Sequence, residues 1–173
     1  MSSESGGVLV RRRTGADLGG CVEVLGEVHR RDGYPVNWPE QPDGWLATPG
    51  LLAAWVAEVD GRVVGHVGLS RAESGDAAPV LWGGGPAVAV VSRLFVGPGA
   101  RGRGVGALLM ARAVREAVGR GLHPVLDVVA SDAAAVALYE RLGWVLLGTV
   151  EQRWGVEQTV LVRCYAAPVV AGV

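Results

Sequence analysis

The sequence predicts an α/β fold in which a mixed sheet is flanked by helices. Three observations support this fold class: apolar runs of strand length, amphipathic segments of helix length, and a hairpin signal at Asp60-Gly61. At 173 residues the chain fits a single domain, 1–173, large enough to bury roughly two-thirds of its unfolded surface. Residues 1–7, rich in serine and glycine, are expected to be a flexible tail of that domain.

The first part of the chain is predicted to run from a strand through a helix into a loop. Val8–Arg12 has the pattern of a strand, and Thr14 can cap a helix whose apolar residues recur at helical spacing to about Arg31. Gly33 to Pro49 holds four prolines, which block regular structure, so a loop or a broken short helix with aromatic anchors is expected. This loop is a candidate wall of a substrate site, and packing of its aromatic residues onto the core is an equally good interpretation.

A hairpin and a glycine-rich connection come next. Ala53–Val59 and Arg62–Arg71 are the expected hairpin strands, because Asp-Gly suits a tight type I′ turn. Ala72 to Pro86 is polar and then glycine-rich, which indicates a flexible connection. The remaining elements are expected in this order: a strand at Val88–Val96, a helix ending near Val118, a strand at Pro124–Val129, a helix that Ser131 or Asp132 caps and Gly143 stops, and closing strands at Val145–Gln152 and Gln158–Tyr165.

Composition excludes several classes of function. The formal net charge of −1 argues against a nucleic-acid-binding protein, which usually has a basic excess. All 16 basic residues are arginine, so mechanisms that need a lysine are excluded. Cys21 and Cys164 make neither a disulfide framework nor a metal site. Without a membrane-length apolar run or a signal-peptide pattern, a cytoplasmic protein is the simple interpretation. The run Arg11 to Arg13 is interpreted as a solvated strand end rather than a docking patch.

The loop from Arg101 to Gly106 is the main candidate for a ligand site. Glycine backbone at a helix start leaves N–H groups pointing outward, and successive N–H groups make a nest for an anion such as phosphate. One alternative is a helix entry whose glycines serve close packing. Another is a dinucleotide fingerprint, since Gly102-x-Gly104-x-x-Ala107 matches the expected pattern, although the antiparallel hairpin before it is poor context.

Two motifs at matching separation resemble those of the GNAT superfamily of N-acetyltransferases. The first, Arg101-x-x-Gly104-x-Gly106, is similar to the pyrophosphate-binding motif of that family. The second is Ala135-x-x-Leu138-Tyr139, followed by Gly143-Trp144. The resemblance implies a single-domain GNAT-like mixed, mostly antiparallel sheet flanked by helices, with a splayed central strand pair. It also implies transfer of an acetyl (acyl) group from acetyl-CoA to the amine of a small molecule or peptide. In that reaction the amine attacks the thioester directly, without a metal.

The same resemblance assigns roles to individual residues. The loop backbone holds the pyrophosphate, with Arg101 or Arg103 adding charge, and free backbone groups of the splayed strand pair with the pantetheine amides. Tyr139 matches the tyrosine that protonates the departing thiolate, and a core tyrosine is its alternative. Asp132 stands where the family often has an asparagine and cannot donate an amide hydrogen bond. The positions expected to bind acetyl-CoA are Leu94, Phe95, Val96, Arg101, Gly102, Arg103, Gly104, Val105, Gly106 and Asp132.

The general base is not fixed by the resemblance. Many family members carry a glutamate near the start of the motif strand, whereas Val88 to Ser92 contains no carboxylate. The candidates are Glu27, His29, His66 and Glu73, of which His66 is the first to test. The missing glutamate also favours a rival function, a non-catalytic acyl-CoA-binding sensor or regulatory protein. Dimers are common in the family, and the sequence leaves open whether this chain forms a homodimer.

Overall fold

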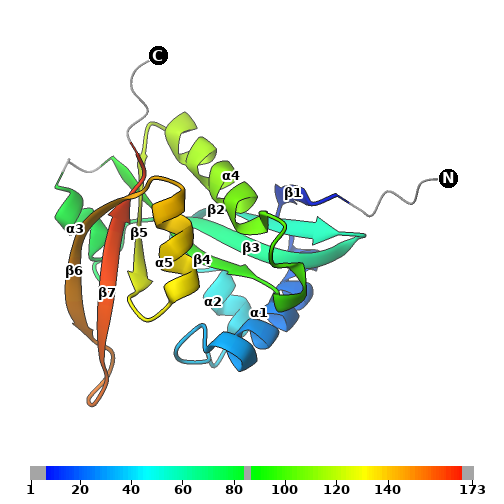
Figure 1. Cartoon of the computed structure of the whole chain (residues 1–173), viewed down its shortest axis with the longest axis horizontal. Coiled ribbons are helices and arrows are strands. Elements are labelled where there is room, and N and C mark those ends of the chain that lie inside the picture. Colours follow the sequence, from blue (N-terminus) through cyan, green and yellow to red (C-terminus); the bar gives the residue numbers. More distant parts are fainter. Residues whose placement is uncertain (1–6, 84–86, 169–173) are drawn as a thin grey trace. The chain divides into compact units, whose positions relative to one another are not determined.

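The computed structural model describes residues 7–83 and 87–168 (Figure 1). Residues 1–6 of the expected tail and Gly84 and Gly85 of the expected connection lie outside the described residues. The elements in chain order are β1 (Leu9–Arg12), a 3-10 turn (Gly15–Asp17), α1 (Leu18–Asp32), α2 (Pro42–Leu46), β2 (Leu51–Val59), β3 (Arg62–Arg71), α3 (Ala78–Trp82), β4 (Val88–Val96), a 3-10 turn (Pro98–Ala100), α4 (Val105–Gly119), β5 (His123–Val129), α5 (Ala133–Arg141), β6 (Val145–Arg153) and β7 (Thr159–Ala166).

The strands pair in the order β1-β2-β3-β4-β5-β7-β6. This mixed, mostly antiparallel sheet flanked by helices is the fold class that the sequence predicts. Residue contacts group the chain into two compact units. The first comprises the described residues up to Ser70 together with Arg93–Ala113, and the second comprises Arg71–Ser92 and the described residues from Val114 onward. Strand β4 and helix α4 therefore contribute to both units.

In the first unit, β1, β2 and β3 lie side by side as an antiparallel sheet (Figure 1). The turn between β2 and β3 has positive φ at both Asp60 and Gly61, 50° and 76°, as a type I′ turn requires. Helices α1 and α2 cover one face of these strands. The core on that face comprises Cys21, Val24, Leu25, Val28, Leu46, Val56 and Phe95.

Residues of β2 and β3 alternate between the α1 face and the α4 face. Val56 lies directly opposite His66 in the register and packs in the α1 core cluster. The next pair, Ala57 and Gly65, faces the other way. A Cβ on Gly65 would lie 3.1 Å from a methyl carbon of Leu109, so the glycine lets α4 pack closely against β3. His66 therefore belongs to the face covered by α1 and α2.

In the second unit, β5, β7 and β6 form an antiparallel sheet with helices on both faces. Cys164 and Ala166 of β7 belong to one core cluster together with Ala78 of α3. Tyr165 between them faces the other way, and its ring lies 6.1 Å from the ring of Tyr139 in α5. Helices α3 and α5 therefore cover opposite faces of β7.

The parallel pair β4 and β5 is splayed. Its register runs from Val88↔His123 to Val90↔Val125 among the described residues, although β4 continues to Val96. The backbone of β4 beyond Val90 thus leaves the β5 ladder. This opening is the splayed central pair that the family resemblance implies.

Helix α3 corrects the prediction of a flexible connection from Ala72 to Pro86. The backbone N–H groups of Ala77 and Ala78 both donate to the carboxylate of Asp127, each at 2.8 Å. Their cap therefore comes from β5, about fifty residues along the chain. Local sequence carries no sign of such a partner.

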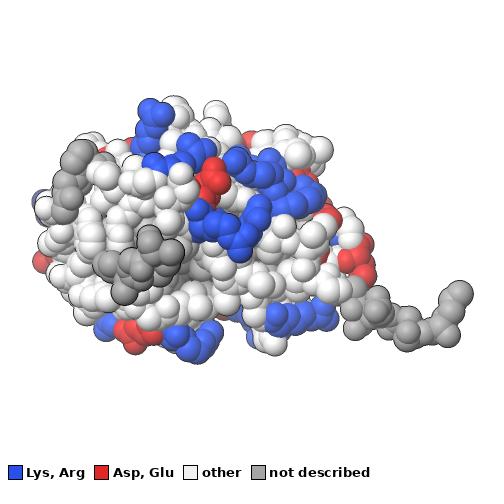
Figure 2. Space-filling view, turned by 90° about the horizontal axis from the view of Figure 1, so that it is seen from above, with Lys and Arg blue, Asp and Glu red and all other residues white. Residues whose placement is uncertain are grey.

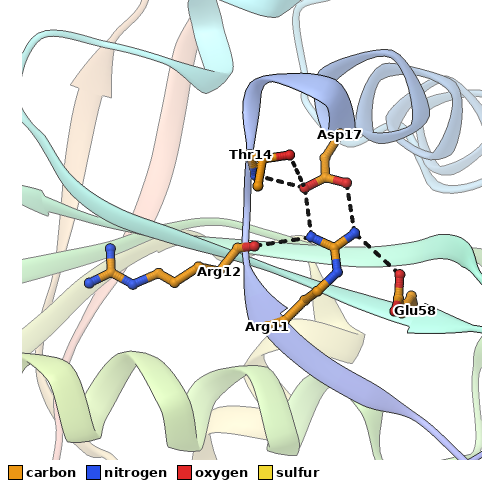
Figure 3. Close-up of polar contacts among 5 residues, drawn as sticks. All are labelled: Arg11, Arg12, Thr14, Asp17 and Glu58. Carbon is orange, nitrogen blue, oxygen red and sulfur yellow. Dashed lines mark hydrogen bonds and ion pairs between the residues drawn. The ribbon is translucent and has the colours of Figure 1, made fainter.

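The arginine run at the end of β1 is a solvated strand end only in part. Arg11 donates to both oxygens of Asp17, at 2.8 and 2.9 Å, and to Glu58 at 3.2 Å (Figure 3). Arg12 is exposed, points away from this group in Figure 3, and lies over the Trp55 ring at 5.4 Å. Arg11 is thus part of an ion-pair network.

Candidate functional site

The loop before α4 has the backbone geometry of an anion nest. Gly102 and Gly104 both have left-handed φ, 81° and 72°, and the stretch from Arg101 to Gly104 is exposed. The first hydrogen bond of α4 runs from the N–H of Leu108 to the carbonyl of Gly104, at 3.1 Å. The N–H groups of the first turn before Leu108 have no acceptor within the helix, as at any helix start. The loop therefore presents donors and a positive helix end to a ligand.

Arg101 ties this loop to the ends of two elements. Its Nη2 donates to the carboxylate of Asp32, the last residue of α1, and to the carbonyl of Val96 at 3.2 Å. Arg103, by contrast, is exposed and makes no ion pair among the described residues. Of the two arginines expected to add charge, Arg101 thus positions the loop and Arg103 keeps its charge available. Asp32 carried no signal in the sequence.

Arginines and acidic residues share the surface of the molecule. Figure 2 shows arginines gathered on the face seen from above, with an acidic side chain in their midst. All basic side chains are arginine, and the formal net charge is −1. Local clusters of arginine therefore coexist with overall charge balance, so attraction of an anion depends on where individual arginines stand rather than on net charge.

The carboxyl half of β4 contains a residue that strands rarely tolerate. Arg93 has φ 55°, in the left-handed region, which bends a strand as in a β-bulge. Of the three residues after it that are expected to face the pantetheine arm, Phe95 is buried, and Leu94 and Val96 are half-buried. Sequence reasoning missed Arg93, since a non-glycine residue inside an apolar run gives no sign of a left-handed backbone.

His66 is enclosed and engaged at both ring nitrogens. Its exposed fraction is 0%, and its ring stacks on Phe95 at 5.1 Å. Because an arginine only donates, the contact of 2.9 Å between Arg13 Nη1 and Nε2 makes Nε2 the acceptor, and Nδ1–H donates to the carbonyl of Arg93 at 2.8 Å. Burial, together with smaller effects of the positive charges of Arg13 and Arg93, lowers the pKa of His66 to about 4, although the hydrogen bond to the Arg93 carbonyl raises it. Arg13, which the sequence predicts to lie in a solvated strand end, instead belongs to this group, because its guanidinium is hydrogen-bonded to a buried ring.

His29 is the other histidine among the base candidates in the first unit. Its Nδ1 lies 2.8 Å from the carbonyl of Pro35, so Nδ1 donates and the lone pair of the neutral ring is on Nε2. The ring is half-buried and lies 5.2 Å from the ring of Trp38. His29 stands three residues before Asp32, which binds Arg101, so both residues lie on one face of α1.

The carboxylates among the base candidates are both exposed. Glu27 lies in α1, with Oε2 3.9 Å from the Cβ position of Gly97. The backbone N–H of Glu73 donates to Asp76 in the second unit. Neither carboxylate is enclosed by the protein, so neither stands out as a base.

Tyr139 and Asp132 belong to the second unit. The Tyr139 side chain is buried, and its ring lies 6.1 Å from those of Trp144 and Tyr165. The Asp132 carboxylate accepts the backbone N–H of Ala135 at 3.3 Å and so caps α5, as predicted. The roles of both residues toward a ligand stay predictions.

A family model decides the relationship that these motifs suggest. The acetyltransferase (GNAT) family matches residues 23–144, well over half of the chain. The chain belongs to the GNAT acetyltransferase family. Within the described residues, no helix is long and apolar enough to cross a membrane, and no group of three or more His, Cys, Asp or Glu side chains could hold a metal ion.

Individual relatives agree with this assignment. A mycothiol acetyltransferase of a Nocardioides species is 38% identical over 105 residues, 58% of this chain and 34% of the relative. The chain thus aligns with about a third of the length of that curated relative. A putative acetyltransferase from Salmonella typhimurium, solved with acetyl-CoA, shares the fold with a TM-score of 0.73, 20% identity and 96% of each chain covered. An Arabidopsis thaliana protein in complex with acetyl-CoA has a TM-score of 0.68, 19% identity, and 92% and 97% coverage.

Proposed function

We propose that this protein is an acetyl-CoA-dependent N-acetyltransferase. The observation that carries the proposal is the exposed loop with two left-handed glycines at the amino end of α4, in a chain of the GNAT family. A Cβ at Gly102 or Gly104 would meet no atom within 4 Å, so these glycines are not required for packing inside the protein. Their backbone conformation and open surroundings fit a diphosphate group bound by main-chain N–H groups.

The parts of the donor site have separate tasks in this proposal. The loop backbone binds the diphosphate, and Arg103 adds a charge that no acidic partner neutralises among the described residues. Arg101 positions the loop through Asp32 and Val96. The splayed end of β4, from Leu94 to Val96, offers backbone groups to the two amides of the pantetheine arm. Asp132 completes the set predicted to lie near the donor.

The reaction is attack of a neutral amine on the carbonyl carbon of the thioester. A carbon–nitrogen bond forms and the carbon–sulfur bond breaks, so the amine loses one proton and the thiolate gains one. A free alkylamine has a pKa of roughly 10, so the acceptor must be deprotonated before attack. We assign that task to His29, because its Nε2 carries the lone pair. Tyr139 supplies the proton to the thiolate.

The acceptor is an amine of a small molecule or peptide, bound along the aromatic segment that runs from Tyr34, after α1, to Trp45 in α2. Tyr34 and Trp45 lie there with ring centroids 6.2 Å apart, and Trp38 stands beside His29. Aromatic faces attract ammonium groups, which suits a charged acceptor before deprotonation. We further propose a cytoplasmic location without nucleic-acid or membrane partners, since Cys21 and Cys164 are free and buried and the fold needs no disulfide. The oligomeric state stays open between monomer and homodimer.

The test is release of free thiol from acetyl-CoA across a panel of amines, including the acceptor of the mycothiol acetyltransferases. Turnover with at least one amine is expected, and a Tyr139→Phe variant is expected to turn over more slowly because it has no proton to donate to the thiolate. Binding of acetyl-CoA without turnover for any acceptor would instead favour the sensor or regulatory protein. A companion melting experiment compares coenzyme A, longer acyl-CoA donors and NAD(P). Stabilisation by NAD(P) and not by coenzyme A would overturn the proposal.

A further inference from the structure

Three contacts within the first unit hold the left-handed residue Arg93. Its carbonyl accepts the Nδ1–H of His66 at 2.8 Å. Its Nε donates to the carbonyl of Trp45 at 3.3 Å, and its guanidinium lies 4.0 Å from the centroid of the Trp45 ring. A left-handed backbone is unfavourable for a non-glycine residue and persists only where its surroundings enforce it. These contacts help to hold Arg93 in the left-handed conformation.

His66 is itself held from the opposite side. Arg13 Nη1 donates to Nε2 of His66 and also to the carbonyl of Leu46, at 2.9 and 2.7 Å. The backbone N–H of Arg13 donates to the carbonyl of Ala54 at 2.9 Å, which fixes the arginine to β2. The imidazole therefore has one tautomer and one orientation. A chain of hydrogen bonds runs from the end of β1 through His66 in β3 to Arg93, whose left-handed backbone bends β4; this bend is called the Arg93 kink.

The same chain of contacts includes helix α2, where the aromatic segment ends. Arg13 binds the carbonyl of Leu46, and Arg93 binds that of its neighbour Trp45, both in α2. The end of β4 and helix α2 are thus fixed by two arginines that share His66 as a common partner. In the proposed function these two places hold the donor and the acceptor.

We propose that His66 is a positioning residue that sets the Arg93 kink and thereby aims the backbone of Leu94 to Val96 at the acyl donor. This inference rests on the proposed function. A base needs a lone pair that reaches the substrate. The lone pair on Nε2 of His66 accepts a hydrogen bond from Arg13, and the side chain of His66 has no exposed surface. The charged groups that face the imidazole are Arg13 and Arg93, both cationic, so protonation has no carboxylate to favour it.

The test uses two amides that each replace one nitrogen of the imidazole. In His66→Asn the amide nitrogen can occupy the Nδ1 position and keep the hydrogen bond to the Arg93 carbonyl. In His66→Gln the longer side chain reaches the Nε2 position, keeps an acceptor for Arg13, and loses the bond to Arg93. His123→Asn, in the second unit, controls for loss of an imidazole as such.

Two measurements separate positioning from base catalysis. Hydrogen exchange of the Leu94 to Val96 amides, measured without any ligand, is expected to speed up in the Gln variant about fivefold to tenfold and to stay within about twofold in the Asn variant. Coenzyme A affinity, measured by calorimetry, is expected to follow the same order, with the His123→Asn control unchanged. The pH profile of turnover keeps its shape in the Asn variant.

Each contrary result has a distinct meaning. If exchange in β4 is unchanged in both His66 variants, the positioning role is wrong. If the Asn variant binds coenzyme A normally but loses kcat and one limb of its pH profile, His66 is the base and the inference is overturned. If the wild-type protein binds no coenzyme A, the proposed function fails, while the exchange data still decide whether His66 sets the kink.

Discussion

Arg11 and Arg13 stand two residues apart on one edge of the first unit, yet they belong to different kinds of network. Arg11 lies directly opposite Val56 in the β1–β2 register, so both arginines project to the face that α1 covers. Arg11 meets carboxylates, those of Asp17 and Glu58. Among the described residues, Arg13 donates instead to an imidazole and a main-chain carbonyl.

The difference separates charge neutralisation from geometric control. The guanidinium of Arg11 is about a third exposed, so water screens its ion pairs and their net value is small. Arg13 binds a ring with no exposed surface, so every lost contact leaves an unsatisfied buried group. An arginine thus pairs with carboxylates at position 11, where it is partly exposed, and orients a buried ring at position 13.

Replacing each arginine by methionine, which keeps the length of the apolar stem, should expose this difference most strongly. Arg13→Met is expected to destabilise the fold by about 4 kcal/mol, because Nε2 of His66 and the carbonyl of Leu46 lose a charged donor. Arg11→Met is expected to cost about 1 kcal/mol. Urea denaturation of both variants measures the two values. Equal losses would mean that burial does not distinguish the networks.

Acid should act on the two networks in separate pH windows. Burial lowers the pKa of His66 from 6.5 to about 4, so between these values the unfolded chain binds a proton that the folded protein refuses. Stability is complete above pH 6.5 and falls by about 3 kcal/mol as the pH drops to 4. The hydrogen bonds from Arg11 and from the backbone of Thr14 together lower the pKa of Asp17 from 3.8 to about 2, so the contribution of the Asp17 carboxylate, about 2 kcal/mol, is lost between those values.

Urea midpoints measured from pH 7 to pH 2 in two variants assign these windows. His66→Asn should flatten the upper window and leave the lower one, and Asp17→Asn should do the reverse. A His66→Asn protein that loses stability between pH 6.5 and 4 as steeply as the wild type would show that another group titrates there.

The glycine loop offers the same contrast on a smaller scale. Arg101 has protein partners at Asp32 and Val96, whereas Arg103 has no ion-pair partner among the described residues. Arg103→Ala is expected to weaken coenzyme A binding about fivefold with an unchanged melting temperature, because an exposed charge near a diphosphate is lost. Arg103→Lys should restore most of the affinity. A drop in melting temperature for Arg103→Ala would place Arg103 in the fold instead.

Arg12, between the two networks, should matter least. It is exposed and lies 5.4 Å from the centre of the Trp55 ring. Arg12→Gln is expected to change the free energy of unfolding by less than about 1 kcal/mol, the usual value of an exposed cation–π contact. Chemical denaturation beside Arg11→Met and Arg13→Met completes the series. A larger loss than for Arg11→Met would reverse the ranking.

Periodicity and turn chemistry were enough to predict most of the fold. The hairpin at Asp60-Gly61, the strand Val88–Val96 and the helix after the glycine loop all follow from local pattern. The open backbone of the loop was predictable because glycines interleaved with arginines at a helix start favour left-handed turns, and its role in anion binding stays a prediction. Helix α3 was not, since the carboxylate that caps it belongs to Asp127.

The hydrogen bonds within the candidate site could not be predicted from the sequence. A lone histidine on a hairpin strand fits a base as well as a structural group, and only the partners of His66 distinguish them. Nothing in the sequence relates Arg13 to Arg93, because their connection passes through His66 in β3 and through Trp45 and Leu46 in α2. The left-handed backbone of Arg93 likewise results from tertiary contacts rather than from residue type.

The attachment of α2 has a consequence for how this protein can diversify. Arg13 and Arg93 donate hydrogen bonds to the main-chain oxygens of Leu46 and Trp45 in that helix. Every substitution at these two positions retains those oxygens. In the proposed function, mutations at the neighbouring positions Asp43 and Gly44 therefore change what the acceptor meets while the helix keeps its attachment. Under that proposal, selection, natural or in the laboratory, can explore new acceptors with little effect on the binding of the donor.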